Sequence, residues 1–280
     1  MRMNVDLSAA MPSPLSAEQI AALARHPSDN PLVEKRAHYL LRRLSKTIRD
    51  YDMIRGGDRV AVAVSGGKDS LSLLDLLLRH RAIAKDKYEI IAIHVATEPP
   101  CGGCLAPDDL AALCRAYGVP LFVERVAEGD LRDRERGEIT CFGCAFQRRK
   151  ALFIAAHREG CNRIAFAHHR DDAATTAMLN LFRHGILLGL EPVRVMFGGV
   201  LTLIRPLLGV DERRLVEFAQ ARGIPPQVSR CPNAATSERV RMAAILRELE
   251  RECPSAKANL LKVVARAAAP GSQDEEIARE

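Results

Sequence analysis

A short apolar run that leads directly into a glycine turn and then a helix is the feature that most constrains the fold of this chain. GGDRVAVAV, residues 56–64, ends in continuous apolar sequence, which is typical of a strand buried on both faces of a parallel sheet. SGGKDSLSLLDLLLRH, residues 65–80, follows at once and opens a helix with a Gly-Gly turn. Strand, tight turn and helix in this order predict the first unit of an α/β fold.

The same alternation of strand and helix continues along the chain. Further buried strands are predicted at residues 88–95, 120–126, 162–169 and 200–207, and helices at 107–118, from about 145 to 159, at 171–185 and at 211–223. This order predicts an α/β fold with a doubly wound, mostly parallel sheet of about five strands. Ligands of such sheets bind at the carboxyl ends of the strands, where loops enter helices.

Three regions are expected from the segments around this alternation. Residues 1–30 lack the basic-then-apolar pattern of a signal sequence and are expected to form a flexible tail. Residues 31–250 should form the main domain, including a basic N-terminal helix, and residues 251–280 a helical, partly disordered C-terminal extension. The missing signal pattern predicts a cytoplasmic protein, and the lack of an apolar run of about 18 residues predicts no membrane span and no membrane partner.

Positive charge is concentrated in the helix that precedes the first strand. The chain has 41 Lys and Arg against 35 Asp and Glu, a net charge of +6. The helix has an apolar face and a basic remainder, and a second basic cluster follows at residues 148–150. Two basic clusters favour a surface that binds a polyanion. With 4% aromatic residues and no tryptophan, recognition by rows of stacked bases is not expected. The apolar face consists of Val33, Ala37, Leu40, Leu44 and Ile48.

SGGKDS, residues 65–70, has the chemistry of a phosphate-binding loop. Two glycines let the backbone approach an anion closely, and the helix that follows presents unpaired N–H groups. Hydroxyl and ammonium donors add to these. The loop matches neither GxxxxGK[ST] nor GxGxxG, so it belongs to neither of those two classes of nucleotide loop. Its residues are Ser65, Gly66, Gly67, Lys68, Asp69 and Ser70.

The pair Cys141 and Cys144, in CFGC, is followed at once by Arg148, Arg149 and Lys150. A Cys-x-x-Cys pair can be half of a zinc site, a redox dithiol or two ligands of an iron–sulfur cluster, and the spacing alone does not choose among them. Structural disulfides are not expected in a reducing compartment. Three other cysteines, Cys114, Cys161 and Cys253, are expected to be buried thiols.

In the order and spacing of its motifs the chain resembles a known family. SGGKDS after a buried strand is similar to the pyrophosphate loop of the N-type ATP pyrophosphatases, which cleave ATP between the α and β phosphates. YDMIRGGDRV, CFGC, FAHHRDDAATTAMLNLF, IRPL and SRCPNAATSER, between about residues 38 and 250, resemble the bacterial enzymes that make 2-thiocytidine in tRNA. This resemblance implies an adenine nucleotide alpha-hydrolase-like, Rossmann-type fold. It also implies an ATP-dependent tRNA sulfurtransferase that acts on a cytidine, at position 32 of the tRNA.

The resemblance also implies cofactors and site residues. ATP with Mg²⁺ would bind at the loop, and a 4Fe-4S cluster would be held by Cys141, Cys144 and Cys231. Lys68, Arg148 and Asp172 are expected to act in adenylation of the base and displacement of AMP by sulfur. His168 is expected to contact the nucleotide, and Asp171 to cap a helix or share the chemistry. The tRNA contacts expected are Arg42, Arg43, Lys46, Arg149, Lys150 and Arg205; a surface ion pair is the alternative for Arg205.

CGGC, Cys101 to Cys104, departs from the family pattern. Two Cys-x-x-Cys pairs together can form a zinc site, which would make Cys231 incidental, and a persulfide relay is another possible role. Other functions also stay open: thiolation of uridine or another acceptor, ligation of an amine, or nucleotide and RNA binding without thiolation. Expected partners are tRNA and a cysteine desulfurase or another sulfur donor, and a homodimer is possible.

Overall fold

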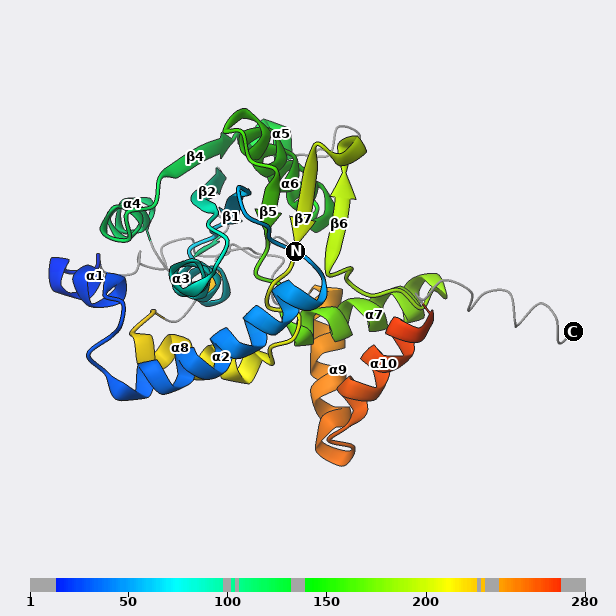
Figure 1. Cartoon of the computed structure of the whole chain (residues 1–280). Coiled ribbons are helices and arrows are strands. Elements are labelled where there is room, and N and C mark those ends of the chain that lie inside the picture. The colour runs from blue at the N-terminus through cyan, green and yellow to red at the C-terminus, as the bar shows by residue number, and fades with distance from the viewer. Residues whose placement is uncertain are drawn as a thin grey trace, which may run out of the picture.

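A computed structural model of the chain describes residues 14–97, 102–103, 106–131, 139–225, 228–229 and 237–267. Its centre is a six-stranded sheet (Figure 1). The strands are β1 (Arg59–Ala63), β2 (Glu89–Thr97), β4 (Leu121–Val126), β5 (Arg163–Ala165), β6 (Val193–Met196) and β7 (Leu201–Ile204). Their order is β4-β2-β1-β5-β7-β6, and all are parallel except β6, which runs antiparallel to β7. The mostly parallel sheet is confirmed, with one antiparallel edge strand more than predicted.

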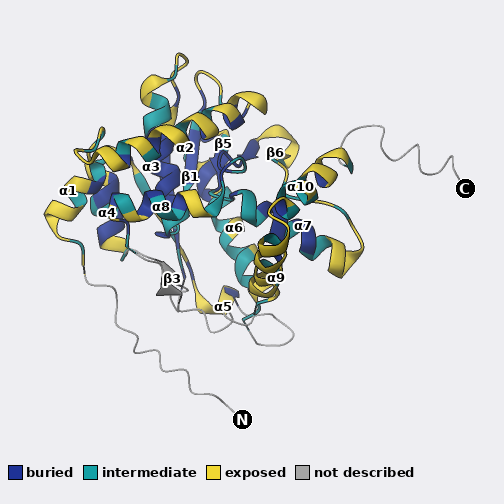
Figure 2. Cartoon of the chain, turned by 90° about the horizontal axis from the view of Figure 1, so that it is seen from below, coloured by how far each residue is buried: buried dark blue, intermediate teal, exposed yellow. Residues whose placement is uncertain are grey.

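Helices cover both faces of this sheet. Successive residues of β1 point to opposite sides, so Val60 and Val62 enter one core and Ala61 the other. The first core packs under α2 (Pro31–Asp50), α3 (Lys68–Ile83), α4 (Pro107–Ala116) and α8 (Glu212–Arg222), and the second under α6 (Cys141–Arg158), with the short α5 (Glu128–Leu131) beside it. Figure 2 shows how completely α3 and the central strands are buried. The doubly wound arrangement is therefore confirmed.

Three helices pack together beyond the sheet. These are α7 (Arg170–His184), α9 (Glu238–Glu252) and α10 (Ala256–Ala267), which lie side by side in Figure 1. Ala174, Met178 and Leu246 form their small apolar core. The helical C-terminal region is confirmed for α10, but the predicted domain boundary at residue 250 falls inside α9. None of the described helices is both long and apolar enough to span a bilayer.

The basic helix forms as its periodicity predicts. All five apolar positions of α2 are at most 5% exposed, because they fill the groove between α3 and α8. Asn30 caps the first turn, and Pro31 occupies the first helical position, where its missing N–H costs nothing.

Residues 14–30 are not the flexible tail that we expected. Ser16 and Gln19 form a capping box that starts α1 (Ala17–Ala24), and α1 packs against α4. The buried carboxylate of Asp75 explains why this N-terminal segment has a defined structure. It accepts hydrogen bonds from Arg222 Nε at 2.7 Å and His26 Nε2 at 2.9 Å, and the Arg222 guanidinium also donates to the backbone carbonyls of Ala22, Leu23 and Arg25. Burial of this charge ties α1 to α3 and α8.

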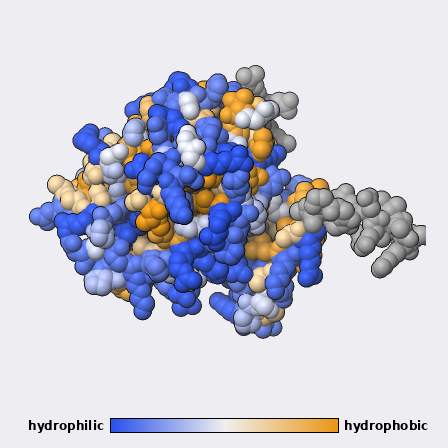
Figure 3. Space-filling model, in the orientation of Figure 1, coloured by the Kyte–Doolittle hydropathy of each residue, from blue (hydrophilic) through white to orange (hydrophobic). Residues whose placement is uncertain are grey.

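Other elements differ from prediction at their boundaries. The helix that carries CFGC begins at Cys141 and not near residue 145, because Thr140 accepts a hydrogen bond from the Gly143 N–H at 3.0 Å and caps it. The edge strand β6 was not predicted. It leads into a short 3₁₀ turn, η1 (Phe197–Gly199), and Figure 3 shows apolar side chains gathered on this edge. Two two-residue strands, β3 (Gly102–Gly103) and β8 (Val228–Ser229), form a separate antiparallel pair.

Candidate active site

The phosphate-binding loop and the HHRDD segment follow neighbouring parallel strands. Residues 65–70 come after β1, residues 168–172 come after β5, and β1 pairs with β5. From this pair the chain winds outward in both directions, through β2 and β4 on one side and β7 on the other. Such a reversal of strand order leaves a crevice at the carboxyl ends of the strands, where α/β proteins bind ligands.

The loop is held in shape by its own serines. Gly66 has a φ of 78°, a conformation that favours glycine. Ser70 Oγ donates to the Gly67 carbonyl at 2.9 Å and accepts from the Ser65 N–H at 3.2 Å. Gly67 is the N-cap of α3, and no side chain caps this helix. The positive end of the α3 dipole is thus available to an anion, as the sequence predicted.

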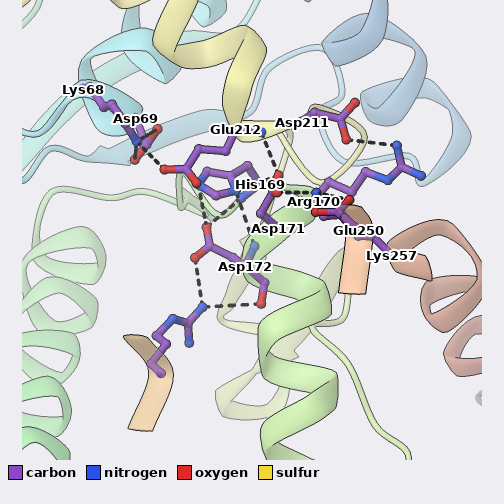
Figure 4. Close-up of polar contacts among 11 residues, drawn as sticks. Lys68, Asp69, His169, Arg170, Asp171, Asp172, Asp211, Glu212, Glu250 and Lys257 are labelled. Carbon is purple, nitrogen blue, oxygen red and sulfur yellow. Dashed lines mark hydrogen bonds and ion pairs between the residues drawn. The ribbon is translucent and has the colours of Figure 1, made fainter. Parts of the chain in front are cut away.

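Lys68 is engaged by two carboxylates (Figure 4). Its Nζ lies 2.8 Å from Asp69 Oδ2 and 3.0 Å from Glu212 Oε1. Burial by itself would lower the pKa of Lys68, but the two carboxylates outweigh it and raise that pKa. The ammonium therefore stays charged at neutral pH. An anion that enters the loop must compete with Asp69 and Glu212 for it.

Asp172, and not Asp171, closes the capping box of α7. The His169 N–H donates to Asp172 Oδ2 at 3.0 Å, and the Asp172 N–H donates to His169 Nδ1 at 3.4 Å. We had expected Asp171, and not Asp172, to cap this helix. Asp171 instead accepts from the Glu212 N–H at 2.7 Å, at the start of α8. Each of these carboxylates thus has one oxygen committed to a helix terminus.

The other oxygen of each carboxylate faces a cation from the C-terminal helices. Arg239 of α9 lies 2.9 Å from Asp172 Oδ1. Lys257 of α10 lies 2.5 Å from Asp171 Oδ1, and Figure 4 labels both of these residues. Burial would raise the pKa of both aspartates, but the cations and backbone donors outweigh it, so both pKa values are lowered and both groups are ionised. Sequence reasoning missed Arg239 and Lys257, because no local motif links them to HHRDD.

His168 and Arg205 form a partly buried pair behind this segment. Burial, reinforced by Arg205, lowers the pKa of His168 to about 4, so the imidazole is neutral at pH 7. Arg205 Nε donates to His168 Nδ1 at 3.3 Å, and its guanidinium also contacts the Glu191 carbonyl. Burial lowers the pKa of Arg205 to about 10. At 8% exposure Arg205 is too buried for the surface ion pair that was one alternative, and its predicted contact with phosphate or tRNA stays a prediction.

Cys141 and Cys144 lie in the first turn of α6. Cys141 is exposed, whereas Cys144 packs on Val95 and Val126 at the carboxyl ends of β2 and β4. The positive end of a helix stabilises thiolates, so this turn suits metal ligands. Among the described residues no group of three metal-ligating side chains is present. Cys101, Cys104 and Cys231 lie outside the described residues.

Backbone pairing nevertheless relates the two chain segments that carry those remaining cysteines. Gly102 and Gly103, the middle of CGGC, pair antiparallel with Ser229 and Val228. Cys231 is two residues beyond Ser229 in the sequence. The described pairing is therefore limited to Gly102 and Gly103 on one side and Val228 and Ser229 on the other.

Arg148 of α6 lies near His94, and its predicted role in catalysis stays a prediction. It is half-buried and contributes to the lowered pKa of His94, for which burial is the main cause. His94 Nδ1 in turn lies 2.7 Å from the carbonyl of Val64, the residue before the loop. Cys144 and Arg148 are four residues apart and so share the inner side of α6.

The two basic clusters do not form one surface. One cluster is exposed on α2, over one face of the sheet, and consists of Arg42, Arg43 and Lys46. The other is exposed on α6, over the opposite face, and includes Arg149 and Lys150.

The burial of the remaining described cysteines differs from our expectation at one position. Cys114 and Cys161 are buried, which raises their pKa values to about 12 and about 11, but Cys253 is exposed because it ends α9. The buried-thiol prediction for Cys253 is wrong.

A glycine loop at a helix N-terminus, beside paired carboxylates and cations, defines a nucleotide-binding protein of the pyrophosphate-loop class. Residues 36–229 match the family model of the PP-loop domain. The tRNA-cytidine(32) 2-sulfurtransferase of Geobacter metallireducens is 36% identical over 250 residues, which cover 88% of this chain and 96% of that protein. The protein of the same name from Bordetella pertussis is 35% identical over 235 residues, 83% and 72% of the two chains.

The chain belongs to the PP-loop family and, within it, to the family of the tRNA-cytidine(32) 2-sulfurtransferases. Its fold is similar to that of the U34-tRNA thiolase NcsA from Methanococcus maripaludis, solved with its [4Fe-4S] cluster. The TM-score is 0.66 at 24% identity, covering 87% of this chain and 82% of that one. The predicted family and fold class are thus confirmed.

Proposed function

We propose that this protein is an ATP-dependent tRNA sulfurtransferase that replaces the 2-oxygen of cytidine 32 by sulfur, as its relatives' name describes. The contacts of Glu212 are the main observation that supports this proposal. The Glu212 side chain lies 3.0 Å from Lys68 Nζ, and its backbone N–H donates to Asp171 at 2.7 Å. The phosphate-binding loop and the HHRDD carboxylates are therefore parts of one site, as adenylation requires.

The first step is adenylation of the base. The loop, residues 65–70, binds the β and γ phosphates of ATP, and cytosine O2 attacks the α-phosphorus. A new O–P bond forms, the bond to the β-phosphate oxygen breaks, and pyrophosphate leaves. Lys68 and Arg148 balance the negative charge of the phosphates. Asp172 supplies a carboxylate suited to Mg²⁺, and the neutral His168 contacts the nucleotide.

The second step replaces the activated oxygen. Sulfide attacks C2 of the adenylated base; it is supplied as such, or it is released from the persulfide of a cysteine desulfurase by a thiol reductant, which is oxidised to a disulfide. The C–S bond forms, the C–O bond breaks, and AMP leaves with the original oxygen. Cys141, Cys144 and Cys231 would hold a 4Fe-4S cluster, and the exposure of Cys141 and the helix N-terminus beneath it fit thiolate ligands. Three cysteine ligands leave one iron of such a cluster open to sulfide.

The products test this proposal. Protein purified without oxygen, supplied with ATP, sulfide and tRNA that lacks the modification, should form 2-thiocytidine, detected by mass spectrometry of tRNA nucleosides. AMP and pyrophosphate should appear in equal amounts. Lys68→Ala should abolish both signals, and Lys85→Ala, a change of an exposed lysine outside the site, should leave them intact. Release of ADP and phosphate would contradict the assignment.

A further inference from the structure

Helix α6 exposes two phenylalanines one turn apart. Phe142 is 78% exposed and Phe146 is 51% exposed. Residues four apart in a helix are neighbours on one face, so the two rings form a continuous apolar surface. Neither contributes to an apolar core. Clustered apolar groups that stay in water mark an interaction surface more often than single ones do.

Two cations share this face. Lys150 lies four residues beyond Phe146, Arg149 lies three beyond it, and both are exposed. Within the described part of the chain neither makes an ion pair. Arg158, farther along the same helix, is by contrast paired with Glu124 at 2.5 Å and with Glu159 at 2.9 Å. Arg149 and Lys150 therefore remain available for an external anion.

The aromatic face borders the candidate active site. Phe142 lies between Cys141 and Cys144 in the chain, and Cys144 packs on Val95 and Val126 at the carboxyl ends of β2 and β4. A ligand on Phe142 and Phe146 would thus sit within one helical turn of the cysteines.

We propose that Phe142 and Phe146 stack on unpaired bases of the tRNA loop that carries the target cytidine, while Arg149 and Lys150 contact the flanking phosphates. This inference rests on the proposed function, because it takes tRNA as the substrate. Aromatic rings beside cations suit single-stranded RNA, whose splayed bases offer ring faces that a duplex hides. The scarcity of aromatic residues led us not to expect stacking, but the fold exposes two of them one turn apart at the start of α6, beside Cys141 and Cys144.

Binding of an anticodon stem-loop RNA with cytidine at position 32 tests this. A 2-aminopurine in the loop reports stacking by fluorescence quenching, and anisotropy gives the affinity. Phe142→Ala and Phe146→Ala should each weaken binding by about 5- to 150-fold, the range for loss of one stacked base, and reduce quenching. Phe142→Tyr should keep both signals, whereas Phe142→Leu should lose them. The control is Ile154→Ala, which removes a side chain 55% exposed about three turns away on the same helix.

Each alternative outcome points to a different error. If wild-type protein binds no RNA, both the proposed function and this inference fail. If RNA binds equally well to the alanine variants, the inference fails while the proposed function stands. Wild-type RNA affinity of Phe142→Leu would indicate simple apolar contact with the RNA and would contradict stacking. If the alanine variants bind RNA normally but lose only sulfur transfer from a protein donor, the face is a docking site for that donor and the inference is wrong. Unchanged pyrophosphate affinity and thermal unfolding of the variants verify that they are folded.

Discussion

Arg239, in the first turn of α9, donates from Nη2 to Asp172 Oδ1 at 2.9 Å, although 67 residues separate the two in the sequence. The other oxygen of this carboxylate accepts the His169 N–H, so Asp172 is held from both sides. In the same way Lys257 and the start of α8 hold Asp171. The C-terminal helices therefore fix the orientation of both carboxylates in the candidate site.

Loss of Arg239 should slow adenylation more than it destabilises the protein. In Arg239→Met, kcat should fall about tenfold or more while KM for ATP changes little, because a misoriented Asp172 acts on the transition state. The unfolding free energy should change by less than about 1 kcal/mol, since the pair is partly exposed. Arg239→Lys should recover part of the rate. Arg247→Met, an exposed change on the same helix, is the control, and equal rates for both methionine variants would remove Arg239 from any positioning role.

Removal of the Glu212 charge should strengthen pyrophosphate binding. In the present structure Lys68 is shared by Asp69 and Glu212, and the entering anion must displace them. Glu212→Gln weakens that competition by about 0.2–1 kcal/mol, so calorimetry should show a dissociation constant roughly 1.5- to 5-fold lower. Lys68→Met should weaken binding in the same assay. Weaker binding to Glu212→Gln would mean that Glu212 holds Lys68 in the productive position.

Acid should destabilise the protein partly through His168. Its pKa is about 4 in the fold against 6.5 as the ordinary value, so the unfolded chain binds the proton more tightly. Between pH 6.5 and 4 the unfolded state binds more protons, and stability therefore falls as pH falls through this window, by up to about 3 kcal/mol. In His168→Gln this contribution is absent. Urea unfolding at pH 7 and pH 4.5 should show a smaller loss for the variant than for the wild type, and an equal loss would contradict the neutral, buried His168.

Iron content should depend on three cysteines that are far apart in the chain. Anaerobically prepared protein should be brown, and it should lose its iron on Cys141→Ala, Cys144→Ala or Cys231→Ala. Cys101→Ala and Cys104→Ala should retain most of it. The exposed Cys253 supplies a matched control, since Cys253→Ala changes a thiol remote from these motifs. About one zinc per chain, lost with Cys101 but indifferent to Cys231, would replace the cluster by a tetrahedral zinc site.

Asp75→Ala should strongly destabilise the fold. The substitution leaves the buried Arg222 without its carboxylate, which costs about 3–5 kcal/mol for a buried ion pair that loses one partner, whereas Arg79 keeps its ion pair with Glu34. Chemical denaturation measures this cost, with Asp86→Ala on the exposed turn before β2 as the control. A cost below about 1 kcal/mol would show that the N-terminal helix is not secured through Asp75.

The sequence predicted what local periodicity determines. The run before SGGKDS identified β1, the glycines identified the loop, and the 3.6-residue repeat identified the buried face of α2, because each signal lies within about 20 residues. The capping box of Ser16 and Gln19 was readable too, although we assigned its segment to a flexible tail. The partners of Asp171, Asp172 and Arg205 were not predictable in this way. Their contacts arise when distant helices pack, and one sequence contains no local trace of that packing.

The late position of Lys257 in the chain has a consequence for folding during synthesis. A growing chain leaves the ribosome from its N-terminal end, so the phosphate-binding loop and the HHRDD segment emerge well before α10 has been translated. Until Lys257 arrives, Asp171 has no ammonium beside it. The nascent protein can therefore build its sheet early, but Asp171 gains its ammonium partner only when α10 docks.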